Sequence, residues 1–387
     1  MTRPVDQRPL HVLEMGTWLT VGGIGRHILS LRDWLRLRGH KVTLAGSPGP
    51  WVNEANEPDY LNLDILSVGH RGGALPWRLL AVVRAALRLR RWLRANPVDV
   101  IHAHDSAPAL VAALARLGLG IPLVVTYHGS EPERIRGFGR IARMCDLTIT
   151  PSHRSADDLS RIGRVPADRL KVIGLGVPPA PNIGQGEVAA LRHQLLAGGD
   201  RLIVTIARLT PQKGIDILID CAASLLKDHP GWRFVIAGDG PEEAHLKELA
   251  ARRNLDPGLS FIGRTSAPHA LLRAADLFLL TSRWEALPFT IVESFQAGTP
   301  TVATACSGVV ELIDDQVGRV APVGDLPAIR AAVEDALADE NRRLAMGTAA
   351  LARAAEDRFD PDWVHPQFEA LYLSLSRPEP LPGQLPR

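Results

Sequence analysis

The sequence predicts an α/β fold of two domains, each built on a parallel β-sheet. Short apolar runs of strand type alternate with helical patterns, and this alternation restarts near residue 201. Between the two series lies GVPPAPNIGQG (residues 176–186), which is rich in Pro and Gly and lacks periodicity. A chain of 387 residues also exceeds what one hydrophobic core normally serves. Such alternation is typical of parallel sheets that carry helices on both faces.

The alternation predicts where each strand lies and where each domain begins and ends. We expect a first domain at residues 1–180 and a second at residues 181–360, with residues 176–186 as the linker between them. A last helical pattern covers residues 361–376. Strands are expected in the first domain at 10–15, 41–45, 98–103, 122–127 and 147–150, and in the second at 202–206, 233–237, 260–262, 277–280 and 301–303.

Composition and charge indicate the cellular compartment of the protein and the charge of its partner. Three widely spaced cysteines without metal-ligand spacing indicate a reducing, cytoplasmic setting. The first ten residues lack the apolar centre of a signal peptide, and no apolar run reaches about 18 residues. Residues 1–180 carry 24 Lys and Arg against 15 Asp and Glu, whereas residues 181–387 carry 20 against 27. The first half is therefore expected to face an anionic partner, although nucleic acid is not expected to be one.

The segment SRWEALPFTIVESFQAGTP (residues 282–300) carries the clearest chemical signal. Glu285 and Glu293 lie on either side of a short loop and the first turn of a helix expected over residues 289–296, with Pro288 at its start. Free N–H groups and the helix dipole at such a turn suit a diphosphate. Carboxylates repel phosphates, so their natural partners are the hydroxyl groups of a sugar and of a ribose. The spacing alone also fits two capping or surface glutamates.

Two cations lie upstream, at the end of another expected strand. The run RLIVTIARLTPQK (residues 201–213) ends in a loop with Arg208 and Lys213, followed by an amphipathic helix. The carboxyl end of a strand in an α/β pattern is where anions usually bind. Arg can hold a phosphate with two parallel N–H bonds, and Lys supplies a compact charge. The alternative is that Arg208 and Lys213 are two solvated cations on the surface that bind no anion.

Together these motifs resemble the retaining glycosyltransferases of family 4, which have the GT-B fold of two Rossmann-like domains facing each other across a cleft. The resemblance covers residues 10–360. It rests on the Arg208 and Lys213-Gly214 pair and the glutamates eight positions apart, and on GGIGRHILSLRDWLRLRGHKVTLAG (22–46), DVIHAHD (99–105), VTYHG (125–129), VIAGDGPE (235–242) and FIG (261–263). Leu287-Pro288 departs from the aromatic residue and glycine that many relatives carry there, which leaves open which amides hold the phosphates.

The resemblance implies a reaction and a set of roles. A hexose is transferred with retention from a nucleotide sugar, without metal or cofactor, to a glycan or lipid-linked acceptor in envelope or exopolysaccharide synthesis. His128 would bond a sugar hydroxyl, Glu285 would contact the sugar and Glu293 the ribose, and helix 361–376 would pack back on the first domain. The catalytic residues would be His128, Arg208, Lys213 and Glu285, and the donor would be bound by Gly23, Arg208, Lys213, Thr290, Ile291 and Glu293.

Other interpretations of two motifs are less favourable. Gly22, Gly23 and Gly25 open a helix after the first strand, but no third glycine or acidic residue completes a dinucleotide-binding fingerprint. The glycines could also serve only a turn that needs positive φ, and His128 could be structural. His102, His104 and Asp105 are residue types that bind metals. In the family that the sequence resembles, however, the same HAHD string is a strand end that holds no metal. A nucleotide-sugar-binding protein without transferase activity, or a GT-B epimerase, remains the alternative function.

One more segment bears on the acceptor. PWRLLAVVRAALRLRRWLRAN (residues 76–96) reads as an amphipathic helix with an apolar face for packing and an arginine row opposite. An outward arginine row would be attracted to anionic lipid headgroups. We therefore expect a cytoplasmic protein that is peripheral at the inner face of the cell membrane. The expected apolar face is Leu79, Val82, Ala86, Leu89, Trp92 and Leu93, and the expected row is Arg84, Arg88, Arg91 and Arg94.

Overall fold

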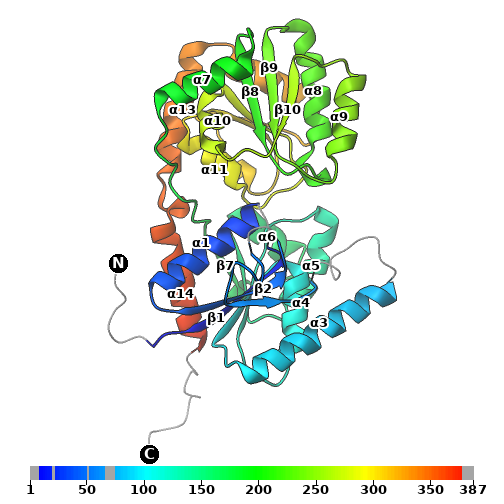
Figure 1. Ribbon diagram of the computed structural model, residues 1–387, viewed down its shortest axis with the longest axis vertical. Helices are drawn as coiled ribbons and strands as arrows, with labels where there is room; N and C mark the ends of the chain where they lie inside the picture. Colours follow the sequence, from blue (N-terminus) through cyan, green and yellow to red (C-terminus); the bar gives the residue numbers. More distant parts are fainter. Residues whose placement is uncertain (1–7, 20–21, 50–51, 66–74, 377–387) are drawn as a thin grey trace, which may run out of the picture.

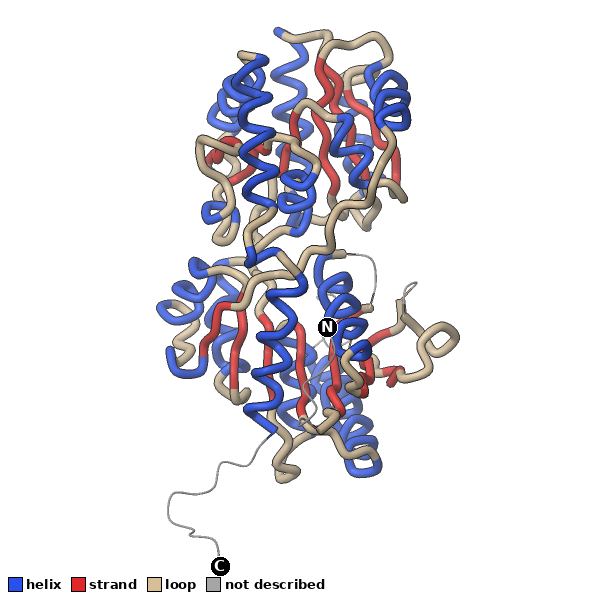
Figure 2. Tube along the Cα trace, turned by 90° about the vertical axis from the view of Figure 1, so that its left-hand side faces the viewer, coloured by secondary structure: helices blue, strands red, loops and turns tan. Residues whose placement is uncertain are grey.

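The computed structural model describes residues 8–19, 22–49, 52–65 and 75–376. It consists of two α/β domains stacked along the long axis of the molecule, with the first domain below the second in Figure 1. In the side view of Figure 2, helices cover both faces of the strands in each domain. The linker and the last helix join the two domains along one side.

The first domain contains a parallel sheet of seven strands, in the order β3-β2-β1-β4-β5-β6-β7. Chain order reverses between β1 and β4, which lie side by side with Glu14 opposite His102. The strands are β1 (His11–Trp18), β2 (Lys41–Ser47), β3 (Tyr60–Asn62), β4 (Val100–His104), β5 (Leu123–Thr126), β6 (Leu147–Thr150) and β7 (Leu170–Val172).

The second domain repeats the plan with six parallel strands, in the order β10-β9-β8-β11-β12-β13. Its chain order reverses between β8 and β11. The strands are β8 (Arg201–Ile206), β9 (Trp232–Ala237), β10 (Leu259–Gly263), β11 (Leu277–Leu280), β12 (Thr301–Thr304) and β13 (Gly318–Ala321). Two doubly wound parallel sheets confirm the predicted fold class.

Helices cover both faces of each sheet. In the first domain they are α1 (Gly23–Leu37), α3 (Leu75–Ala95), α4 (Ser106–Ala115), α5 (Ile135–Ala142) and α6 (His153–Arg161). The remaining helices are α7 (Gln185–Leu196), α8 (Ile215–Asp228), α9 (Glu243–Arg252), α10 (Pro268–Ala274), α11 (Phe289–Gln296), α12 (Leu326–Leu337), α13 (Glu340–Ala354) and α14 (Pro361–Ser376).

Alternation along the strands divides the first domain into two cores. Leu13, Met15, Ile101 and Ala103 pack with α3, α4 and α5 on one face. Val12 and Val100, one position away along the same strands, pack with α1 and α14 on the other. Glu14, His102 and His104 therefore point to the α1 and α14 face, where they are fully buried.

The last helix, α14, crosses back to the first domain and completes that second core. Val364, Phe368, Leu371 and Tyr372 are buried among residues of β1, β4 and α1. Glu369 fixes its position, because the carboxylate accepts hydrogen bonds from Arg38 Nε at 2.9 Å and from His40 Nε2 at 2.7 Å. One chain end thus stabilises the domain formed by the other (Figure 1).

The three strands that the sequence did not predict are all edge strands. β3, β7 and β13 are three or four residues long, and each pairs with a single neighbour. An edge strand is covered less completely than a central one, so its side chains carry a weaker apolar pattern. None of the helices in the described ranges is long and apolar enough to cross a membrane.

The apolar face predicted for residues 76–96 needs one correction. Val82, Ala86, Leu89 and Leu93 of α3 are buried against the first domain, as expected. Leu79, however, is 57% exposed. In Figure 1 the first turns of α3 extend beyond the helices that it packs against, so position 79 has no surface to cover.

Candidate active site

The candidate active site is a cleft between the carboxyl edges of the two sheets. The first domain contributes Gly22, Gly23 and Arg26, from the start of α1. The second contributes residues that follow its strands and begin α11: Ile206, Ala207, Arg208, Lys213, Ala237, Gly238, Asp239, Arg264, Thr265, Pro268, Phe289, Thr290 and Glu293. The ends of parallel strands at a reversal of strand order are where α/β proteins bind their ligands.

The N-terminus of α11 opens into this cleft. The helix has the bounds that the sequence predicted, and Pro288 precedes it in an extended conformation. Thr290 lines the cleft. Ile291 does not, because its side chain is fully buried and its amide donates to the Pro288 carbonyl at 3.2 Å. Of these two predicted donor-binding residues, only Thr290 lies at the wall.

Glu293 sits one turn further along the same helix and is 2% exposed. Its Oε1 pairs with Arg26 Nη1 from the first domain. Its Oε2 is buried and has no hydrogen-bond partner within the described parts of the chain. A buried carboxylate oxygen without a donor is unfavourable, so this atom offers a strong acceptor to any hydroxyl that enters the cleft.

The two predicted cations reach the cleft by different routes. Lys213 ends a short 3-10 turn after β8, and its Nζ pairs with Oε1 of Glu285, which is itself buried. Ser282 Oγ donates to the same carboxylate oxygen at 2.8 Å. The guanidinium of Arg208 lies 4.7 Å from the ring centroid of Trp18, at the end of β1. Both cations thus contact groups that keep them at the cleft.

His128 follows β5 and approaches the second domain at the loop that holds Glu285. A Cβ added to the next residue, Gly129, would lie 2.7 Å from the Ala286 amide nitrogen, with φ at +94°. Only glycine allows the two loops to meet this closely. The contact places the backbone of Gly129, next to His128, against that of Glu285 and Ala286, although neither His128 nor Glu285 is among the residues that line the cleft.

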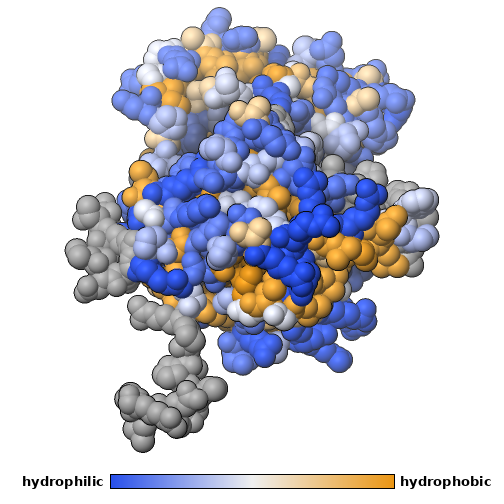
Figure 3. All heavy atoms as spheres, turned by 60° about the horizontal axis from the view of Figure 1, so that its bottom comes forward, coloured by the Kyte–Doolittle hydropathy of each residue, from blue (hydrophilic) through white to orange (hydrophobic). Residues whose placement is uncertain are grey.

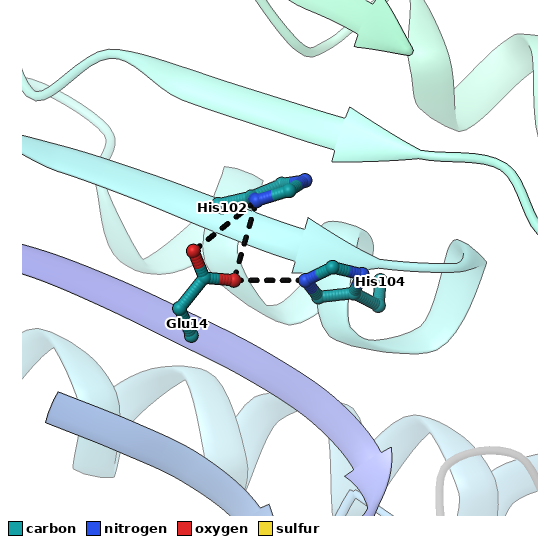
Figure 4. Close-up of side chains that lie close together, drawn as sticks. All are labelled: Glu14, His102 and His104. Carbon is teal, nitrogen blue, oxygen red and sulfur yellow. Dashed lines mark hydrogen bonds and ion pairs between the residues drawn. The ribbon is translucent and has the colours of Figure 1, made fainter. Parts of the chain in front are cut away.

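Behind His128 lies a buried polar cluster of Glu14, His102 and His104 (Figure 4). Glu14 Oε2 is 2.8 Å from His104 Nε2, and Oε1 is 3.3 Å from His102 Nδ1. One ligand atom from each residue lies within 4.8 Å of the others, so the three have the donor set of a metal site. Hydrogen bonds already engage each of these atoms, which accounts for the cluster as a network.

Burial and the contacts between these residues determine which side chains of the network are charged. Burial alone would raise the pKa of Glu14, but interactions with His102 and His104 outweigh it and lower that pKa to about 2. Burial also lowers the pKa of His104 to about 4. Burial, followed by the neighbouring histidines, holds the pKa of His128 well below its usual value. At neutral pH Glu14 is therefore a carboxylate, and the imidazoles of His104 and His128 are neutral.

The sequence did not identify three residues that shape the site. Arg26 pairs with Glu293 across the cleft, Trp18 lies under Arg208, and Glu14 contacts both histidines. A signal existed for Glu14, since it is a charged residue at the centre of an apolar strand. The contacts of Arg26 and Trp18 join segments that are far apart in sequence, and no local pattern indicates them.

Comparison with known families assigns the chain. Residues 21–180 match the model of Glycosyltransferase Family 4, and residues 189–353 match that of Glycosyl transferases group 1. The D-inositol 3-phosphate glycosyltransferase of Acidothermus cellulolyticus is 30% identical over 315 residues, which is 74% of this chain and 70% of that protein. The protein belongs to the group 1, family 4 glycosyltransferases.

Two further proteins, one compared by sequence and one by structure, are similar to this chain over most of its length. The glycogen synthase of Mycobacterium tuberculosis is 27% identical over 393 residues, 94% of either chain. The structure of Anabaena HepE in complex with UDP-glucose superposes with a TM-score of 0.76 at 21% identity, covering 94% of this chain and all of that one. The fold is GT-B, and the protein is a glycosyltransferase.

The buried histidines predict a loss of stability in acid. His27, His104, His128 and His365 all have a pKa below the ordinary 6.5, in each case chiefly through burial. Below pH 6.5 the unfolded chain therefore binds protons that the folded chain excludes. The unfolding free energy is at its full value above pH 6.5 and decreases as the pH falls towards 4. We expect each to cost on the order of 1–2 kcal/mol of unfolding free energy at pH 5.

Urea unfolding at pH 7.5, 6.5, 5.5 and 5.0 measures this slope. His27→Leu is the matched variant, because neither ring nitrogen of His27 has a hydrogen-bond partner within the described residues. It should flatten the slope while leaving the fold intact. An unfolding free energy that stays constant from pH 7.5 to 5.0 would contradict the buried neutral state of these histidines.

Proposed function

We propose that the protein is a retaining, metal-independent hexosyltransferase that uses a nucleotide sugar as donor. The observation that carries this proposal is the convergence at one cleft of Arg208, Lys213, the α11 N-terminus and the unpaired Oε2 of Glu293. Cations and free N–H groups suit a diphosphate, and a buried acceptor suits a ribose hydroxyl. The UDP-glucose complex of HepE supports a donor of this class.

The proposed reaction stabilises the leaving group. As the bond between the anomeric carbon and the phosphate oxygen breaks, negative charge grows on the diphosphate and positive charge on the sugar ring. Lys213, Arg208 and the Thr290 end of α11 lie where they can neutralise the diphosphate. Lys213 would exchange Glu285 for phosphate, which frees that carboxylate to accept sugar hydroxyls. The acceptor hydroxyl would attack from the face that the diphosphate leaves and give its proton to a phosphate oxygen.

Helix α3 supports a lipid-linked acceptor at a membrane surface. Trp77 is 70% exposed, and Leu80, Val83 and Leu87 are also exposed along the same helix. Arg84, Arg88, Arg91 and Arg94, which lie mainly towards the C-terminal half of the helix, are exposed as well. Figure 3 shows apolar and strongly polar surface side by side on this domain. Apolar side chains among cations are typical of a helix that lies on an anionic membrane.

We therefore place the proposed reaction in the cytoplasm, at the inner face of the cell membrane. Its product would contribute to envelope or exopolysaccharide synthesis. An acceptor that is anchored in lipid explains why a protein would keep a large apolar side chain such as Trp77 in solvent, at the tip of a helix that extends beyond its own domain.

Replacing Lys213 by Ala tests the phosphate site. The diphosphate would lose a partly buried cation, and Glu285 would lose its ion pair, so transfer should fall by the equivalent of about 2–5 kcal/mol. Arg208→Lys should also reduce transfer, because an ammonium cannot reproduce the planar fork. Turnover of labelled nucleotide sugars at saturating donor measures both. The exposed Lys247→Ala is the control, and near-normal turnover by Lys213→Ala would refute the proposed phosphate site.

Transfer should persist in excess chelator, because side-chain cations and helix N–H groups take the place of a metal at the proposed diphosphate site. The measurement is the initial rate after dialysis against EDTA, compared with the rate after addition of Mg²⁺ or Mn²⁺. Equal rates are expected. Loss of activity on chelation that either metal restores would show that the proposal of a metal-independent reaction is wrong.

The α3 surface should bind anionic vesicles reversibly and less strongly at high salt, at about 1 kcal/mol per arginine near the membrane. Co-sedimentation with phosphatidylglycerol-containing and purely zwitterionic vesicles measures this binding. Arg84→Gln, Arg88→Gln and Arg91→Gln together should abolish it, and Trp77→Ser should weaken it. Lys247→Gln, Arg252→Gln and Arg253→Gln, on α9 and at its C-cap, remove the same charge from the second domain and should have no effect. Equal binding by the two triple variants would exclude α3 as the membrane contact.

A further inference from the structure

We propose that Glu14 and His104 act as positioning residues that hold His128 in one tautomer, with hydrogen on Nε2 and a bare Nδ1. The three side chains form a hydrogen-bonded chain that runs from the middle of the first sheet to the cleft. This assignment extends the proposed function, because it gives a chemical state to the histidine beside the transferred sugar.

The hydrogen-bonded chain consists of two consecutive hydrogen bonds. Glu14 Oε2 lies 2.8 Å from His104 Nε2, and His104 Nδ1 lies 3.0 Å from His128 Nε2. The rings of His104 and His128 stack with centroids 5.2 Å apart and planes inclined by 25°. Glu14 and His104 are buried, whereas His128 is partly exposed, so only the His128 end of the chain is exposed, at the carboxyl edge of the first sheet.

The direction of each hydrogen bond follows from the charge at the buried end. An ionised Glu14 can only accept, so His104 must carry its hydrogen on Nε2. A neutral His104 then has a bare Nδ1, which can only accept the hydrogen of His128 Nε2. A neutral His128 is left with a lone pair on Nδ1, which has no hydrogen-bond partner within the described residues. That nitrogen can accept a hydrogen bond from a hydroxyl in the cleft.

Glu14 is itself held from the other side. Tyr372 of α14 donates to Glu14 Oε1 at 3.1 Å and lies 2.6 Å from His102 Nδ1. Thr126 Oγ1 lies 2.7 Å from His102 Nε2, which fixes that ring in turn. Both oxygens of Glu14 are thus engaged, and Oε2, which orients His104, also lies 3.2 Å from His102 Nδ1. The C-terminal helix thereby takes part in setting the state of a residue at the cleft.

A buried negative charge at one end of such a chain also strengthens the far acceptor. The carboxylate makes His104 more electron-rich, and His104 passes this effect to His128 through the shared hydrogen. The role resembles that of a carboxylate that sets the tautomer of a histidine in other sites, where removal of the partner commonly costs about 10- to 100-fold. Orienting a hydroxyl of the transferred sugar would affect the rate more than donor binding.

Imidazole ¹⁵N chemical shifts of the full chain at pH 7.5 test the tautomers directly. Protonated and bare ring nitrogens give distinct shifts, and the signals of His128 are assigned by their loss in His128→Asn. We expect His104 and His128 both to carry hydrogen on Nε2. In Glu14→Gln the amide can donate as well as accept, so His128 should become a mixture of tautomers. An Nδ1–H form of His128 in the native chain would overturn the proposal.

Steady-state kinetics then separates positioning from stability. Glu14→Gln should lower kcat about 10- to 100-fold with little change in the KM for the donor. The matched control is Glu57→Gln, which alters another buried carboxylate of the same domain, one that pairs with Arg32 and Arg36 at 2.7 Å. It should lower the unfolding free energy but leave kcat unchanged. An unchanged kcat in Glu14→Gln, or an equal fall in Glu57→Gln, would refute the positioning role.

The two measurements also distinguish this proposal from the proposed function. Native tautomers as expected, together with no turnover of any nucleotide sugar, would reject the transferase proposal and retain the hydrogen-bonded chain. Turnover with the opposite tautomer of His128 would reject the chain and retain the transferase.

Discussion

The site depends on a constraint of parallel sheets: all strands end at the same edge, and here the two edges must face each other. Because the sheets are covered on both faces by helices, the carboxyl edges are the surfaces where polar groups can gather. Contacts between the domains hold these edges together. Gly129 meets the backbone of Ala286, Arg26 pairs with Glu293, and Ser307 Oγ donates to Asp158 at 2.8 Å. These contacts are made by loops and helices that follow the strand ends of the two sheets.

Two cations at the cleft are paired with carboxylates. Lys213 contacts Glu285, and Arg26 contacts Glu293. Pairing lowers the cost of keeping a buried carboxylate ionised, since an uncompensated charge in a dry site is unfavourable by several kcal/mol. It also places each group within reach of a diphosphate or a hydroxyl without a large rearrangement. The network of Glu14, His102 and His104 follows the same rule one layer deeper, with Tyr372 as the donor that completes it.

Helix α3 shows why a helical pattern alone does not assign faces. The half of the helix near Leu89 and Leu93 buries its apolar face against the first domain. Nearer the start of the helix, apolar residues such as Trp77, Leu79 and Leu80 remain in solvent. Apolar residues occur in both parts of the helix. What differs is whether a neighbouring element is present to cover the face, which depends on where the helix ends relative to the sheet.

The sequence by itself determined the two parallel sheets, the central strands and the bounds of α11. These features are local, because they follow from apolar periodicity and from Pro and Gly at element ends. It also placed Arg208, Lys213 and Glu293 at element ends, from which the fold carries them into the cleft. Only the tertiary structure decided that Thr290 rather than Ile291 faces that cleft, and that Arg26, Trp18 and Glu14 join the site. Those contacts depend on the packing of segments distant in sequence, and hydrogen bonds and ion pairs of this kind leave no periodic trace in a single chain.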